Sequence, residues 1–187
     1  MEGSINEHIN RCLTGDQAAF REVVNRYRSR MIRLAYRYVH DWEEAADISQ
    51  DAFLRAYSAL AGFDQSKKFD AWLMRIVVNL SLDRLRHTAT VRTRQADIHR
   101  MLPGRKENPE LAAVGGEQLC RLHELMDELN ERQRTVFVLR ELEGLDYHAI
   151  ARLLGCSPAT VRVHLFTAKR RLRMGLATVS PIEEGIG

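Results

Sequence analysis

The sequence contains few cysteines, few prolines and no long apolar run. Its 187 residues include three cysteines and four prolines. Cys12, Cys120 and Cys156 are widely separated and odd in number, and the start of the chain shows no signal-peptide pattern, which argues against a disulfide-bonded secreted protein. No apolar run approaches the roughly 20 residues that a transmembrane helix requires. The sequence therefore predicts a reduced, cytoplasmic protein without direct membrane insertion.

Familiar catalytic motifs are also lacking. The sequence has no phosphate-binding glycine loop, zinc-protease motif or serine elbow. Cys120 and His123 have a Cys-x-x-His spacing, but no second pair of ligands accompanies them, so we predict that they pack rather than bind zinc. We accordingly predict no catalytic residue, no metal site and no cofactor, and we expect a binding protein rather than an enzyme.

The charged residues nearly balance, but they are unevenly distributed. Lys and Arg total 28 and Asp and Glu total 25, so the net charge is only +3. Residues 41–51 contain five acids and no Lys or Arg, whereas residues 157–180 contain five basic residues and no acid. We expect the acidic segment to avoid nucleic acid and the basic segment to attract it.

The spacing of apolar residues predicts an all-α fold. Apolar residues recur at intervals of three and four along most of the chain, without the sustained alternation typical of strands. Asp16 is expected to cap a first long helix that ends near His40. Asp41, with Glu44 as its capping-box partner, should begin a second helix. The residues expected to face the core are Phe20, Val23, Val24, Tyr27, Met31, Leu34 and Val39 in the first helix, and Ile48, Ala52, Phe53, Ala56 and Leu60 in the second.

A third helix is predicted from about Phe69 to His87, after a short loop at residues 63–68. It should bury Leu73, Ile76 and Leu80. Beside this core the spacing brings five further residues into one stripe, because they recur at helical intervals. They are Trp72, Arg75, Asn79, Asp83 and Arg86.

Periodicity fades after residue 88, and Pro103, Gly104 and Pro109 interrupt it. This stretch is mildly basic and could lie along a groove or be solvated. Four short helices are predicted beyond it, at about residues 117–129, 131–143, 147–154 and 158–176, with caps at Asn130, Asp146 and Ser157. The sequence therefore predicts two small helical domains, at residues 1–88 and 115–187, joined by a flexible linker at residues 89–114.

The segment from Asp146 to Leu165 has the pattern of a helix-turn-helix. Gly155 allows the tight turn, and Val161 and Leu165 should hold the second helix against the first so that its other face stays exposed. An α-helix fits the major groove, while basic residues meet phosphates. An ordinary helical hairpin with a solvated basic face is the alternative interpretation. The residues predicted to contact DNA are Thr160, Arg162, Val163, His164, Thr167, Lys169, Arg170, Arg171 and Arg173.

Longer motifs in both halves resemble one protein family. The C-terminal motif runs from Met126 to Ala151 (MDELNERQRTVFVLRELEGLDYHAIA) and continues into the helix-turn-helix. The N-terminal motifs are DQAAFR from Asp16, EEAADISQDAFLRAY from Glu43 and FDAWLMRIVVNLSLDRLR from Phe69. In order and spacing they resemble regions 2 and 4 of the extracytoplasmic-function (ECF, group 4) sigma factors of the sigma-70 family. That family directs RNA polymerase to a subset of promoters and helps to open them.

The resemblance implies roles for individual residues of the N-terminal half. Asp47, Gln50 and Asp51 match the Asp-x-x-Gln-Asp/Glu motif that binds the clamp helices of the largest subunit of core RNA polymerase. The loop at residues 63–68 and the third helix match the element that captures the melted non-template strand at the minus-ten sequence. The implied minus-ten contacts are Phe63, Trp72, Arg75, Asn79 and Arg86. A solvated acidic face, and core packing of Trp72, explain the same residue types without any partner.

The resemblance assigns minus-thirty-five recognition to the helix-turn-helix. Arg162 is expected to dominate base reading, with Thr167 making a weaker contact and the basic run from Lys169 meeting phosphates. The flap of the second-largest polymerase subunit is a further expected partner. An anti-sigma factor is expected to cover the polymerase-binding surfaces.

Two functions from other classes remain alternatives at this point. A stand-alone helix-turn-helix regulator would bind duplex operator tightly without polymerase, whereas a sigma factor would bind promoter DNA weakly until core enzyme is added. An enzyme with an appended DNA-binding domain is disfavoured, because the acids between Glu43 and Asp51 have no accompanying base or metal-ligand set.

Overall fold

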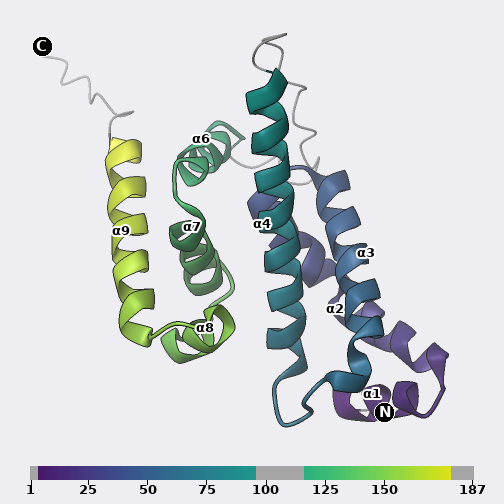
Figure 1. Ribbon diagram of the computed structural model, residues 1–187. Helices are drawn as coiled ribbons and strands as arrows, with labels where there is room; N and C mark the ends of the chain where they lie inside the picture. The colour runs from purple at the N-terminus through teal and green to yellow at the C-terminus, as the bar shows by residue number, and fades with distance from the viewer. Residues whose placement is uncertain (1–3, 96–115, 178–187) are drawn as a thin grey trace, which may run out of the picture. The chain divides into compact units, whose positions relative to one another are not determined.

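The computed structural model describes residues 4–95 and 116–177, and the prediction of an all-α fold is confirmed. The described ranges contain helices and connecting turns but no strand. The chain divides into two compact units, Met1–Asn108 and Pro109–Gly187 (Figure 1). Most of the predicted linker, including Arg100, Arg105 and Lys106, lies outside the described residues.

Unit 1 is built around one long helix. Its elements are α1 (Ile5–Leu13), α2 (Gln17–Val39), α3 (Trp42–Ser58), the 3-10 turn η1 (Leu60–Gly62) and α4 (Phe69–Gln95). Helices α1, α3 and α4 all pack against α2 (Figure 1). The largest fully buried side chains of this unit are Ile9, Val23, Met31, Leu34, Tyr38, Ile48, Leu73, Met74 and Val77.

Helix α1 was not predicted, because the sequence was expected to begin its first helix at Asp16. Asp16 caps α2, the predicted long helix, by accepting from Ala19 N at 3.2 Å, and this cap is confirmed. Helix α1 has its own capping box, in which Ser4 Oγ accepts from Glu7 N and Ser4 N donates to Glu7 Oε2. Only two of its nine side chains, Ile9 and Cys12, are buried in the core. Two buried positions are too few to show a helical period in the sequence.

The predicted Asp41 cap at the start of α3 is confirmed. His40 ends α2 in the left-handed conformation, at φ 56°, and Asp41 caps α3 by accepting from Glu44 N at 2.9 Å. The Glu44 carboxylate lies 3.6 Å from the Arg84 guanidinium of α4, so it also links α3 to α4. The predicted apolar side of α3 is buried.

Helix α4 departs from the prediction in its length and in part of its core. It continues to Gln95 rather than ending near His87, because no glycine or proline interrupts residues 88–95. Leu73 and Leu80 are buried as predicted, but Ile76 is only half-buried. Met74 and Val77 lie in the core beside Leu73, so the buried stripe of α4 is broader than predicted.

Unit 2 contains α6 (Gly116–Asp127), α7 (Glu131–Phe137), the π-helical turn η2 (Val138–Leu142), α8 (Tyr147–Leu154) and α9 (Pro158–Ala177). Helix α9 packs against α6, α7 and α8. Arg134 is buried, donates from Nε to Met126 O at 3.0 Å and pairs with Asp127 at 3.4 Å, which fixes the end of α6 on α7. The core of this unit includes Leu125, Met126, Leu129, Val136, Val138, Leu139, Ile150, Leu153, Val161, Leu165, Ala168 and Leu172.

The predicted caps of unit 2 are confirmed, with one correction to the second helix. Asn130 and Gln133 form a capping box, Asp146 accepts from Ala149 N, and Ser157 accepts from Thr160 N. The predicted helix 131–143 is not α-helical throughout, because its last part closes π-type bonds such as Glu143 N to Val138 O at 3.0 Å. In the described ranges, no helix combines the length and apolarity that a bilayer crossing requires.

Gly175 of α9 supports a prediction about the packing of unit 2. A Cβ at this position would lie 2.1 Å from Leu125 Cδ2 of α6, and Leu125 is itself buried. Ala is normally favoured over Gly in a helix by about 1 kcal/mol. Here we expect Gly175→Ala to lower the free energy of unfolding by about 1–3 kcal/mol, the usual range for overpacking.

Denaturant unfolding of the two single variants and the double variant measures this effect. In a Leu125→Ala background the added methyl group has room, so Gly175→Ala should stabilise the protein relative to Leu125→Ala alone. A stabilising Gly175→Ala in the wild-type background would show that α6 and α9 are not in close contact at this point.

Candidate functional site

The predicted polymerase contacts lie on the exposed side of α3. Asp47, Gln50 and Asp51 are all exposed, because Ile48 and Ala52 turn the opposite side of the helix into the core. The exposed side continues with Leu54, which is 60% exposed, and with Tyr57. The predicted acidic and amide-bearing ridge is therefore accompanied by an apolar surface that the sequence pattern did not indicate.

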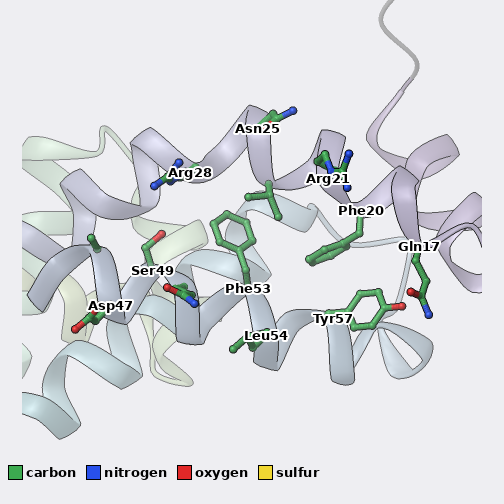
Figure 2. A pocket seen from close by; sticks show the side chains of 13 residues that line it. Gln17, Phe20, Arg21, Asn25, Arg28, Asp47, Ser49, Phe53, Leu54 and Tyr57 are labelled. Atoms are coloured by element: carbon green, nitrogen blue, oxygen red, sulfur yellow. The ribbon is translucent and has the colours of Figure 1, made fainter. Parts of the chain in front are cut away.

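A groove of about 580 Å³ runs between α2 and α3 (Figure 2). Phe53 and Phe20 meet edge to face at its base, with ring centroids 6.4 Å apart, and Tyr57 lies 5.0 Å from Phe20. Asp47 and Gln50 line the groove, whereas Asp51 lies outside its lining. The complete lining is Gln17, Phe20, Arg21, Val24, Asn25, Arg28, Ala46, Asp47, Ser49, Gln50, Phe53, Leu54 and Tyr57.

The two sides of the groove differ in charge. Helix α2 contributes Arg21 and Arg28, and α3 contributes Asp47 (Figure 2). Ser49 also lines the groove, is 1% exposed, and its Oγ has no hydrogen-bond partner within the described part of the chain. An unsatisfied buried hydroxyl costs about 1–3 kcal/mol. The groove can thus accept an apolar ridge flanked by charges of both signs.

The predicted minus-ten residues on α4 differ in how much surface they offer. Arg75 and Asn79 are exposed, and Trp72 is half-buried. Arg86 is exposed but forms an ion pair with Asp83 at 2.8 Å. Both alternatives for Trp72 therefore have some support, since part of its ring is packed and part faces solvent.

Phe63 belongs to an aromatic cluster beneath this stripe. It is only 8% exposed, and its ring centroid lies 4.9 Å from Trp72 and 5.5 Å from Phe69. In this conformation Phe63 supports Trp72 and offers little surface of its own, so a direct contact between Phe63 and DNA stays a prediction.

The loop at residues 63–68 is held by a network around Asp64. The Asp64 carboxylate accepts from Ser66 N and Ser66 Oγ and pairs with Lys67 at 3.2 Å. The hydrogen bond from the Ser66 hydroxyl is the main reason that the pKa of Asp64 is lowered. Gln65 Nε2 donates to Asn10 Oδ1 at 2.8 Å, which ties the loop to α1. The unpredicted helix therefore helps to position the predicted base-binding loop.

The helix-turn-helix exposes one side of α9. Gly155 ends α8 in the left-handed conformation, at φ 64°, and Val161 and Leu165 are buried as predicted. Thr160, Arg162 and Val163 are exposed, while His164 and Thr167 are half-buried. The Thr167 hydroxyl donates to Val163 O at 2.9 Å, so part of its hydrogen-bonding capacity is used within the helix.

Phe166 lies on the same exposed side and was not predicted. Its side chain is 68% exposed, and that of Val163, one turn before it, is 63% exposed. Its place between the buried Leu165 and the half-buried Thr167 could have been read from the helical period. Apolar side chains can contact the methyl group of thymine in the major groove.

The basic run at the end of α9 is partly neutralised within unit 2. Lys169 Nζ lies 2.9 Å from Glu141 Oε1, and Arg171 Nη1 donates to Gln133 Oε1 at 3.3 Å. Arg170 and Arg173 are exposed and have no partner within the described residues. These two arginines are the cations best placed to meet phosphates.

Arg162 lies against an aromatic ring of the preceding helix. Its Cζ is 5.2 Å from the centroid of the Tyr147 ring, and Arg140 Cζ is 4.9 Å from the same centroid. The motif from Met126 and the helix-turn-helix that continues it together contain all three residues, but the sequence did not indicate that they meet.

Within residues 4–95 and 116–177, no group of three or more His, Cys, Asp or Glu side chains could hold a metal ion. The side chain of Cys120, from the predicted Cys-x-x-His pair, is outside the described side chains.

Comparison with known proteins identifies both halves of the chain. The sigma-70 region 2 family model matches residues 23–90, and the sigma-70 region 4 model matches residues 121–172. The RNA polymerase sigma-H factor of Pseudomonas aeruginosa is 34% identical over 90% of this chain and 91% of its own length. The ECF RNA polymerase sigma factor SigW of Bacillus subtilis is 31% identical over 94% of this chain and 98% of its own length.

Solved structures show the same fold. CnrH, in complex with the cytosolic domain of CnrY, is 25% identical, with a TM-score of 0.68 over 92% of this chain and 97% of CnrH. The sigma factor RpoE of Bartonella quintana, in complex with the anti-sigma factor NepR, also has a TM-score of 0.68, at 19% identity over 86% of this chain and 98% of RpoE. Together with the two family models and the curated relatives, these likenesses show that the chain belongs to the ECF sigma factors of the sigma-70 family.

Proposed function

We propose that this sigma factor uses three separate helix faces for three binding tasks. The exposed side of α3 and its groove bind core RNA polymerase, the stripe on α4 binds the melted minus-ten strand, and the exposed side of α9 reads the minus-thirty-five duplex. The observation that supports this division most directly is the chemistry of each face, which is acidic and apolar on α3, aromatic and polar on α4, and basic on α9. Each task is binding, so the protein acts as a subunit and not as an enzyme.

The groove between α2 and α3 suits the clamp helices of the largest polymerase subunit. A helix that inserts an apolar ridge into the groove, against Phe53 and Leu54, would bring its flanks toward Asp47 on the α3 side and Arg28 on the α2 side. Charged groups of both signs would fix the position of the partner helix along the groove. Hydrogen bonds to charged groups are also stronger than hydrogen bonds between neutral groups. Asp51 lies beyond the groove lining, so it would contact the edge of the partner.

The α4 stripe suits single-stranded DNA. Trp72 offers part of an aromatic face for stacking, and the exposed Asn79 offers an amide that can both donate and accept hydrogen bonds to a base edge. Arg75 lies between them in sequence and can pair with phosphate. Stacking becomes available only after the strands separate, so this face favours the melted state.

On α9, Arg162 is the proposed base reader and Arg170 the proposed phosphate anchor. Val163 and Phe166 add an apolar surface between these two arginines, which suits the methyl group of thymine. Thr167 is a weaker candidate, because its hydroxyl already donates to Val163 O.

A regulatory partner and a cytoplasmic location belong to the same proposal. CnrH was solved with the cytosolic domain of CnrY, and RpoE with the anti-sigma factor NepR. An anti-sigma factor that covers the α2–α3 groove would block core polymerase directly. The flap of the second-largest polymerase subunit remains the proposed partner of unit 2.

The polymerase contact can be tested with Asp47→Ala combined with Gln50→Ala. We expect association with core polymerase, and run-off transcription that depends on it, to fall by about ten-fold or more, since a hydrogen bond to a charged group contributes about 1.5–3 kcal/mol. Thermal unfolding should change little, because both side chains are exposed.

Glu22→Ala is the matched control, since Glu22 is an exposed acid of α2 outside the groove lining. Unchanged affinity of the double variant for core polymerase would remove α3 as the docking surface. Tight promoter binding by the isolated chain would instead favour a stand-alone regulator.

Asn79→Ala tests the minus-ten face. We expect it to impair promoter opening more than initial duplex binding, because Asn79 can contact a base edge only after the strands separate. Stacking on an aromatic side chain also forms only after melting, and it contributes about 1–3 kcal/mol per base. Open-complex formation is measured on duplex and pre-melted bubble templates, and the bubble should rescue most of the defect. Equal defects on both templates would contradict a role in melting.

Trp72→Ala should also impair promoter opening more than duplex binding. It removes contacts to Phe63 and Phe69 as well, so it should also lower the stability of the protein.

Arg170→Ala tests the assignment of phosphate anchors. Holoenzyme binding to promoter fragments should weaken for all sequences alike, and the dependence of log K on log salt should become shallower by about one unit. Glu141→Ala should have the opposite effect, since it releases Lys169 from its ion pair. A changed base preference in Arg170→Ala would show that Arg170 reads sequence.

A further inference from the structure

Two arginines of unit 2 share the ring of Tyr147. Arg140 comes from the π-helical turn η2, Tyr147 is the first residue of α8, and Arg162 lies in the second turn of α9. The guanidinium carbons lie 4.9 Å and 5.2 Å from the ring centroid, within the range of a cation–π interaction. Three consecutive elements of the helix-turn-helix region therefore meet at one aromatic side chain.

Hydrogen bonds hold the backbone on both sides of Tyr147. Asp146, the residue before it, caps α8 by accepting from Ala149 N at 2.8 Å, and this hydrogen bond lowers the pKa of Asp146. Arg140 donates from Nη1 to Leu145 O at 2.9 Å, which joins the turn before α8 to the same group. The backbone that carries Tyr147 is thus held, and Arg140 lies against its ring, without any contribution from Arg162.

Arg162 gains order from this arrangement. Its side chain is exposed, and an exposed arginine ordinarily samples many rotamers, whose loss on binding costs conformational entropy. A guanidinium that already lies over the Tyr147 ring has fewer orientations to lose. The Arg140 charge on the same ring also adds to the positive potential that a guanine edge or a phosphate would meet.

We propose that Tyr147 is a positioning residue that orients Arg162 for base reading in the minus-thirty-five element. The proposal rests on the proposed function, in which Arg162 is the base reader. The ring presents the aliphatic and guanidinium parts of Arg162 in one direction before DNA arrives. Tyr147 acts through Arg162 and need not touch a base itself.

A merely structural role for the ring makes a different prediction. If Tyr147 only stabilises unit 2, its loss should weaken binding to every sequence alike and in proportion to the loss of stability. If it positions Arg162, its loss should weaken preference at the base positions that depend on Arg162 and leave the other positions unchanged.

The experiment is a selection of randomised minus-thirty-five elements with holoenzyme that contains the full chain. The variants are Arg162→Ala, Tyr147→Leu, Tyr147→Phe and the combination of Tyr147→Leu with Arg162→Ala. We expect Arg162→Ala to flatten preference at one or two positions, and Tyr147→Leu to reduce preference at those positions by about two- to five-fold, the range of an exposed cation–π contact. Tyr147→Phe should retain the preference, because it keeps the ring, and the double variant should match Arg162→Ala.

A second measurement reports on the side chain without DNA. Ring currents of Tyr147 should shift the NMR signals of the Arg162 δ-methylene protons, and Tyr147→Leu, but not Tyr147→Phe, should abolish that shift. Thermal unfolding of each variant separates this effect from a general loss of stability.

The outcomes distinguish failure of the proposal from failure of the proposed function. If Arg162→Ala flattens the preference while Tyr147→Leu retains it, Tyr147 does not position Arg162 and only the present proposal fails. If Arg162→Ala itself keeps the wild-type preference, Arg162 is not the reader and both fail. A Tyr147→Phe variant as defective as Tyr147→Leu would also overturn the proposal, because the face of the ring would not be the active feature.

Discussion

The burial of α2 is the constraint on which unit 1 depends. Helices α1, α3 and α4 all pack against it, and side chains such as Val23, Leu34 and Tyr38 are fully buried along its length. Because α3 and α4 must each turn one side toward α2, only their opposite sides are available to partners. Asp47 and Asp51 of α3 and Arg75 and Asn79 of α4 are exposed for this reason, so the surfaces that we propose for partners follow from the packing of the core.

The same constraint acts on α9 in unit 2, but there charge pairing also matters. The buried stripe that contains Val161 and Leu165 sets which side of α9 faces solvent. Glu141 then pairs with Lys169, and Gln133 accepts from Arg171. The ion pair offsets the charge of Lys169, whereas the bond to the neutral Gln133 orients Arg171 without removing its charge. Counting basic residues in the sequence therefore overstates the charge that the recognition helix presents.

Apolar and unsatisfied groups mark the surfaces that this chain leaves for other molecules. Leu54 beside the α2–α3 groove and Phe166 on α9 are both at least 60% exposed, and Ser49 keeps a buried hydroxyl without a partner in the described residues. Each is unfavourable in an isolated protein, since apolar surface and unpaired polar groups both cost free energy. Their occurrence on the proposed binding faces is consistent with a protein that completes its packing when it binds polymerase and promoter DNA.

Sequence patterns indicated most of the helices and the resemblance to the family. Caps such as Asp41, Asn130 and Asp146 act locally, and the helical period indicates which side of α3 or α9 is buried. Helix α1 and the π-helical end of helix 131–143 could not be predicted from the sequence. A short helix shows few periods of apolar residues, and a change from α-helical to π-helical hydrogen bonds leaves little trace in the sequence pattern. Only the tertiary structure showed that Lys169 pairs with Glu141, that Phe63 lies beneath Trp72 and that Arg162 lies against Tyr147. These contacts join side chains from different elements, and local sequence patterns carry no information about the distance between two helices once they pack.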